Sequence, residues 1–175
     1  MAVKESKLKH NIREFLLDEG ILRGNIKDNK LDFGFQFTFP PGPGGQNMAV
    51  FKPKGKDLII ISLGTQISPP HVEALNALGD KQMNFFIDLR KFLLLRNMLF
   101  RIDIKNYRYE ISEQIFIDEE KLISKNRFFK YIRKVFSSAA YANMILSEYC
   151  EGRVKFSPDK KAKDLSSSTD FSLYL

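Results

Sequence analysis

The sequence has one cysteine, no tryptophan and two histidines among its 175 residues. A single cysteine, Cys150, excludes a disulfide framework and a cysteine-based zinc site. His10 and His71 fall on separate predicted elements without ligand-like spacing, so we expect neither a metal nor a cofactor. The most apolar stretch, residues 85–104, contains six charged side chains, which excludes a membrane span. The N-terminus lacks the apolar region of a signal peptide, so we expect a cytoplasmic protein.

The most informative stretch is residues 31–39, Leu-Asp-Phe-Gly-Phe-Gln-Phe-Thr-Phe. Every second side chain is Leu or Phe, a period of two that is typical of a strand and incompatible with an amphipathic helix. The other face is polar, which indicates an antiparallel sheet with one covered side. A continuous apolar run at residues 58–63 predicts a central strand covered on both faces.

Periodicity and turn residues predict the remaining elements. We expect helices at residues 4–19, 68–78, 81–96 and 124–149, and strands at residues 31–39, 47–52, 58–63, 98–105 and 107–117. This gives an α+β fold, a five-stranded antiparallel sheet flanked by helices in the order α-βββ-α-ββ-α. We expect one domain over residues 1–152, followed by a flexible polar tail at residues 153–175 with an apolar C-terminal end.

The order of these elements resembles the class I type III secretion chaperone-like fold, a small α+β module that binds other polypeptides. The Phe-rich first strand, Ser68-Pro69-Pro70-His71 before the middle helix and Ile117-Asp118 before the last helix are also similar to an uncharacterised archaeal family assigned to that fold group. The resemblance covers residues 5–150. It implies a protein-interaction function and carries no catalytic residues with it.

The helix at residues 81–96 is apolar in more directions than one core-facing stripe requires. We therefore expect part of it to face a protein partner or a second copy of the chain. The candidate partner-binding residues on this helix are Phe85, Phe86, Phe92 and Leu95. A second candidate group is the apolar end of the tail, Phe171, Tyr174 and Leu175, which would dock onto a partner or onto the domain itself.

Gly44-Gly45-Gln46 resembles the loop of bacterial class I peptide release factors and their ribosome-rescue relatives. The resemblance implies that Gln46 would position a water molecule for hydrolysis of peptidyl-tRNA, with the two glycines as its hinge. The Asn-Lys pair that follows in that family is missing, because residues 48–50 are Met-Ala-Val. The other interpretation is a Pro/Gly-rich connection between two strands.

The net charge of +7 favours an anionic partner such as nucleic acid. Basic residues gather in the first half of the last helix, where Lys130, Arg133 and Lys134 alternate with the aromatic residues Phe129 and Tyr131. This pattern is compatible with a phosphate-contacting face and also with an ordinary solvated helix face. The sequence therefore favours a non-enzymatic protein-interaction or chaperone-like module, with peptidyl-tRNA hydrolysis and nucleic-acid binding as the alternatives.

Overall fold

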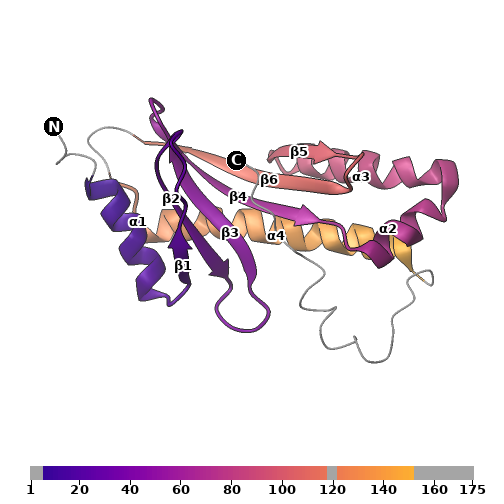
Figure 1. Cartoon of the computed structure of the whole chain (residues 1–175), viewed down its shortest axis with the longest axis horizontal. Coiled ribbons are helices and arrows are strands. Elements are labelled where there is room, and N and C mark those ends of the chain that lie inside the picture. The colour runs from indigo at the N-terminus through magenta and orange to yellow at the C-terminus, as the bar shows by residue number, and fades with distance from the viewer. Residues whose placement is uncertain (1–5, 118–121, 152–175) are drawn as a thin grey trace. The chain divides into compact units, whose positions relative to one another are not determined.

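The computed structural model describes residues 6–117 and 122–151, and Figure 1 shows how their elements follow one another. In chain order these are α1 (Ser6–Asp18), β1 (Leu22–Asn25), β2 (Leu31–Phe39), β3 (Gln46–Pro53), β4 (Leu58–Gln66), α2 (Pro69–Asn76), the 3₁₀ helix η1 (Gly79–Lys81), α3 (Gln82–Leu95), β5 (Leu99–Asp103), β6 (Arg108–Phe116) and α4 (Lys125–Cys150). The six strands form one sheet in the order β1-β2-β3-β4-β6-β5, so β1 and β5 are the edge strands. The α+β class is confirmed.

The prediction of five strands in the order α-βββ-α-ββ-α is wrong by one strand. The additional strand is β1, which pairs antiparallel with β2 and places Leu22 opposite Phe37. Its register shifts between Leu22 and Gly24, so apolar residues do not alternate along its four residues. Such a segment has no strand signal in the sequence. It forms because the chain leaving α1 runs along β2, where the Thr38 N–H donates to the Ile21 carbonyl at 3.0 Å.

The chain divides into two compact units, each described here by itself. Unit 1 comprises Met1–Leu63 and Ser112–Phe136, and unit 2 comprises Gly64–Ile111 and Ser137–Leu175. All three boundaries between the units fall inside single elements, since β4, β6 and α4 each contribute residues to both units. One domain over residues 1–152 remains a prediction, and the predicted tail lies outside the described residues.

Unit 1 is built on the aromatic face of β2. Phe33, Phe35 and Phe37 are buried, whereas Gln36 on the opposite face is exposed, as the alternation predicts. Helices α1 and α4 add further aromatic side chains to this unit, since Phe15 of α1 and Phe128 of α4 lie with ring centroids 5.9 Å apart. The hydrophobic core of this unit is therefore largely an aromatic one.

Unit 2 contains α2, η1, α3 and the β5–β6 hairpin. Its helical break at residues 79 and 80 is confirmed, because Gly79 adopts a φ of 58° between α2 and α3. Tyr109 of β6 is buried and donates its hydroxyl to Oδ1 of Asn143 in α4 at 3.0 Å. Burial raises the pKa of Tyr109 well above its usual value. The face of β6 that carries Tyr109 is thus the face that α4 covers.

Candidate functional site

Helix α3 has two apolar faces. Its inner face is formed by Phe85, Phe86, Leu89 and Leu93, all of which are buried. The exposed apolar residues of this helix are Met83, Ile87, Leu94 and Leu95. Leu94 is 63% exposed and Leu95 is 86% exposed, so two neighbouring leucines add to the exposed apolar surface of α3.

The inner face of α3 packs against α4. The ring of Phe85 lies 5.9 Å from that of Tyr149, and Phe92 stacks on Tyr141 at 4.4 Å. The prediction that Phe85 and Phe86 bind a partner therefore has to be corrected, because both side chains lie in the interior of unit 2. Phe92 is half-buried in its stack, so of the predicted helix residues only Leu95 projects freely into solvent.

A polar contact joins the same two helices. The Tyr149 hydroxyl donates to Oδ2 of Asp88 at 2.5 Å. This hydrogen bond, together with Lys91, holds the pKa of Asp88 below its usual value, and it raises the pKa of Tyr149 to about 12. The contact fixes the rotation of α3 and with it the outward direction of the exposed leucines.

A left-handed residue connects α3 directly to the edge strand β5. Asn97 has a φ of 50° and donates its N–H to the Leu94 carbonyl, while the Met98 N–H donates to the Leu93 carbonyl, both at 3.0 Å. This is a Schellman motif with asparagine in the position that glycine usually takes. It brings the exposed end of α3 next to Leu99, the first residue of β5, which is also exposed.

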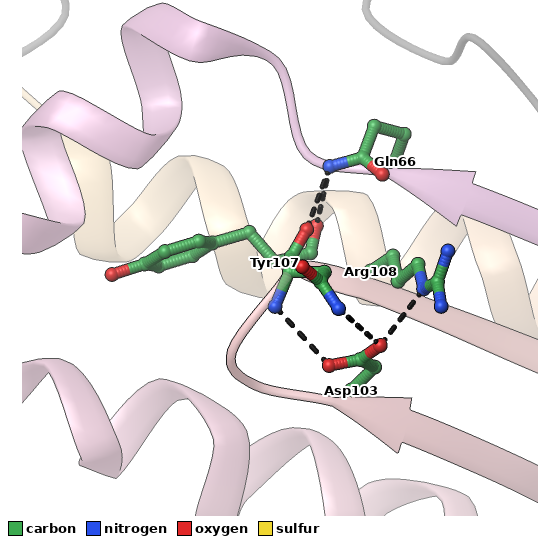
Figure 2. A network of polar contacts seen from close by, with 5 residues as sticks. Gln66, Asp103, Tyr107 and Arg108 are labelled. Atoms are coloured by element: carbon green, nitrogen blue, oxygen red, sulfur yellow. Dashed lines mark hydrogen bonds and ion pairs between the residues drawn. The ribbon is translucent and has the colours of Figure 1, made fainter.

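The β5–β6 hairpin is closed by a polar network (Figure 2). Asp103 accepts hydrogen bonds from the backbone and side-chain amides of Asn106, and its Oδ2 lies 2.9 Å from Nε of Arg108. The hydrogen bonds from Asn106 and Arg108 lower the pKa of the Asp103 carboxyl. Gln66 of β4 donates its amide to the Asn106 and Tyr107 carbonyls at 2.9 and 3.2 Å, which ties the turn to the neighbouring strand.

A cavity of about 60 Å³ lies beside this network and is lined in part by Arg101, Arg108 and Glu110. It has room for a few water molecules and not for an organic cofactor. Burial raises the pKa of Glu110, and the positive charge of Arg101 opposes that rise. Sequence reasoning missed this charged hairpin, although its signal was present: Arg101, Asp103, Arg108 and Glu110 alternate on one face on either side of a turn.

The Gly44-Gly45-Gln46 segment belongs to the connection from β2 to β3. A Cβ atom on Gly45 would lie 2.4 Å from the Pro40 carbonyl oxygen, so the glycine is required for a close approach of the backbone. Gln46 is the first residue of β3 and pairs with Phe39. Its Oε1 is buried and has no hydrogen-bond partner in the described part of the chain. The segment therefore presents a strand start rather than an exposed catalytic glutamine.

The basic half of α4 is only partly exposed. Nζ of Lys134 lies 2.6 Å from Oε2 of Glu113 on β6, which accounts for the one charged residue on the apolar side of that strand. Lys130 and Arg133 are exposed, and Arg133 lines an open hollow of about 480 Å³ with Phe39 and Phe129.

The remaining basic residue at this hollow is Lys125, at the start of α4. Lys125, which also lines that hollow, is paired with Asp18 and Glu19 at 3.3 and 2.8 Å, so acidic residues offset part of its positive charge. The predicted tail residues Phe171, Tyr174 and Leu175 lie outside the described residues.

A protein-family model matches residues 8–146 of the chain, and its description reads "Uncharacterized conserved protein (DUF2299)". The match extends over most of the chain and includes residues of both units. The chain belongs to the DUF2299 family.

The DUF2299 chain is also similar to a solved structure, the crystal structure of an uncharacterized protein from the archaeon Methanothermobacter thermautotrophicus. The two share 26% sequence identity with a TM-score of 0.72, over 81% of this chain and 98% of the other. No match to this DUF2299 chain was found among functionally curated proteins. The resemblance to an uncharacterised protein family is therefore confirmed, and the similar solved structure is that of an archaeal protein, whereas the type III secretion chaperone-like fold remains a prediction.

Two further results concern the described residues of this DUF2299 chain. None of their helices is long and apolar enough to cross a membrane. Among them, no group of three or more His, Cys, Asp or Glu side chains is arranged to hold a metal ion.

Proposed function

We propose that this protein is a non-enzymatic, chaperone-like interaction module that binds a protein partner at the β5 side of unit 2. The observation that carries the proposal is the exposed apolar face of α3, and above all the exposure of Leu94 and Leu95 beside an edge strand. Exposed apolar surface of this kind typically marks a protein-interaction site. The proposal takes up the resemblance to chaperones that bind polypeptides.

An edge strand adds a second source of binding energy. Among the described residues strand β5 has a neighbouring strand on one side only, so its other side offers backbone N–H and C=O groups to an added strand. Backbone hydrogen bonds provide affinity in this mode of recognition, and side chains next to the strand provide selectivity. In this protein the neighbouring side chains are Leu99 and Arg101, both exposed, together with the outward face of α3.

The two alternatives gain no comparable support. Catalysis by Gln46 would need its amide at an exposed loop, and its Oε1 is buried. Nucleic-acid binding by the basic half of α4 would rest on Lys130 and Arg133, since Lys134 is directed to Glu113.

The proposal is tested by titrating fluorescent peptides with alternating apolar residues, and by measuring self-association, with the full chain. The double variant Leu94→Ser/Leu95→Ser should weaken whichever association is found by about 10-fold, because it removes the apolar anchors. The matched control is Leu17→Ser, which removes an exposed leucine from α1 in unit 1 and should change nothing. A wild-type protein that neither binds peptides nor self-associates would refute the proposed function.

A further inference from the structure

The charges of the β5–β6 hairpin pair across the two strands. The turn is closed by the Tyr107 N–H, which donates to the Ile104 carbonyl at 3.2 Å. Counting back from this closing pair places Asp103 opposite Arg108 and Arg101 opposite Glu110. The first pair is in direct contact at 2.9 Å, and the charge of Arg101 acts on the Glu110 carboxyl. Each row across the hairpin therefore contains one positive and one negative side chain.

The hydrogen bonds at the turn determine which backbone groups face the open side of β5. The Tyr107 carbonyl accepts from the Ile67 N–H at 2.9 Å, on the β4 side, so the N–H of Arg108 points the other way, toward Asp103 at the end of β5. In an antiparallel ladder, hydrogen-bonded residues alternate with residues whose N–H and C=O point the other way. Asp103 and Arg101 therefore bond toward β6, whereas Ile102 and Phe100 direct their backbone groups to the free edge, where a further strand can bond to them.

We propose that the strand added to this edge is β5 of a second copy of the chain, paired antiparallel about a two-fold axis at Ile102. The inference rests on the proposed function and names its partner. Residues that face each other in a sheet must point to the same side, so a symmetric pairing has to place one residue opposite its own copy. Within the charged part of β5 that residue is Arg101, Ile102 or Asp103.

Charge selects among these three registers. An axis at Arg101 places two guanidinium groups opposite each other, and an axis at Asp103 does the same with two carboxylates, both of which are unfavourable. An axis at Ile102 instead places each Arg101 opposite the second copy's Asp103. Across the joined hairpins the row then reads Glu110, Arg101, the second copy's Asp103, the second copy's Arg108, so that the sign of the charge alternates without interruption. Only this register extends the pattern that each hairpin already has.

Helix α3 supplies the apolar area that a short strand pair lacks. Stable interfaces bury about 1,200–2,000 Å² in total, more than two strands of this length provide. A two-fold axis perpendicular to the sheet brings both copies of α3 to the same sheet face, on either side of the axis. Ile87, Leu94 and Leu95 are the exposed residues of α3 that this arrangement makes available for burial.

Sedimentation equilibrium of the full chain over a concentration series tests the proposal. We expect a dimer whose dissociation constant rises about 10-fold in Arg101→Glu, because the substitution places like charges opposite each other twice. Lys130→Glu makes the same charge change at an exposed position in unit 1 and should leave the dimer intact. Circular dichroism verifies that both variants are folded.

Disulfide trapping then tests the register independently of stability. Under mild oxidation Ile102→Cys should form a covalent dimer, and Arg101→Cys should not, because only position 102 faces its own copy. A dimer that is trapped through position 101, or through neither position, would overturn the inference and leave the proposed function standing. A monomeric wild type that binds peptides would have the same consequence, whereas a monomer that binds none would refute both.

Discussion

The two edge strands of the sheet, β1 in unit 1 and β5 in unit 2, differ in length, regularity and exposure. In unit 1 the edge strand β1 has four residues and a register shift, features that natural sheets use to discourage the addition of another strand. In unit 2 the edge strand β5 has exposed residues at both Leu99 and Arg101, and its neighbour α3 has an apolar outer face. This difference is the reason why our proposal places the interaction in unit 2.

The interiors of the units differ as well. Unit 1 depends on packed aromatic rings, such as Phe39 of β2 against Phe136 of α4 with centroids 5.5 Å apart. In unit 2 polar contacts accompany the apolar ones: Tyr109 bonds to Asn143, and Tyr149 bonds to Asp88. Unit 1 should therefore respond most to the loss of buried volume, and unit 2 to changes in ionisation.

The largest effect is expected from Phe37→Ala. Phe37 is fully buried in unit 1, so removing its ring leaves a cavity and should lower the free energy of unfolding by about 3–5 kcal/mol. The control is Phe116→Ala in the same unit, where the ring is 71% exposed and the cost should be under about 0.5 kcal/mol. Urea denaturation of both variants measures the difference, and equal costs would contradict an aromatic core in unit 1.

A smaller effect is expected from Gly45→Ala in the β2–β3 connection. The new Cβ would lie 2.4 Å from the Pro40 carbonyl oxygen and 2.5 Å from Cγ2 of Thr38, so the backbone has to shift at a cost of about 1–3 kcal/mol. The neighbouring Gly44 offers a matched control, because a Cβ there would meet no atom within 4 Å. Thermal unfolding of the two variants compares them. If Gly44→Ala proved the more destabilising, the close approach at Gly45 would not be the reason for this glycine pair.

Long periodic segments made much of the fold predictable. The alternation in β2 and the apolar stripes of α1 and α4 were sufficient, because one covered face determines the period of a strand or helix. Strand β1 was not predictable from its own residues, because it forms only by pairing with the free edge of β2. The number of strands was therefore wrong even though the predicted elements were correct in type.

The candidate site was predictable in part. The excess of apolar residues identified α3 as a candidate. The sequence of a helix does not determine which of its faces packs against another helix. For this reason Phe85 and Phe86, which are buried, were predicted to bind a partner. The contacts of Tyr141 and Tyr149 with α3 decide that orientation, and they join segments more than 45 residues apart in the sequence. The charged residues that lie opposite each other on β5 and β6 could have been predicted from the position of the turn alone, which the sequence indicates near Asn106.

The smallest effect, and the one most specific to unit 2, concerns the dependence of stability on pH. The pKa of Asp88 is lowered in the folded state, so its stabilising contribution is complete above the usual carboxyl value of 3.8 and is lost as the pH falls through the folded value. The pKa of Tyr149 is raised to about 12, so its contribution is complete below the usual value of 10.0 and is lost as the pH rises through 12. The stability difference between wild type and Tyr149→Phe should therefore be constant between about pH 5 and 9 and decrease on both sides. Tyr141→Phe, which removes a hydroxyl from the same helix and keeps the ring that stacks on Phe92, is the matched control, and both variants are measured by urea denaturation across the range. If the stability difference between wild type and Tyr149→Phe were instead the same at acid, neutral and alkaline pH, ring packing alone would hold α3 against α4. Unit 2 would then resemble unit 1 in the interactions that stabilise it.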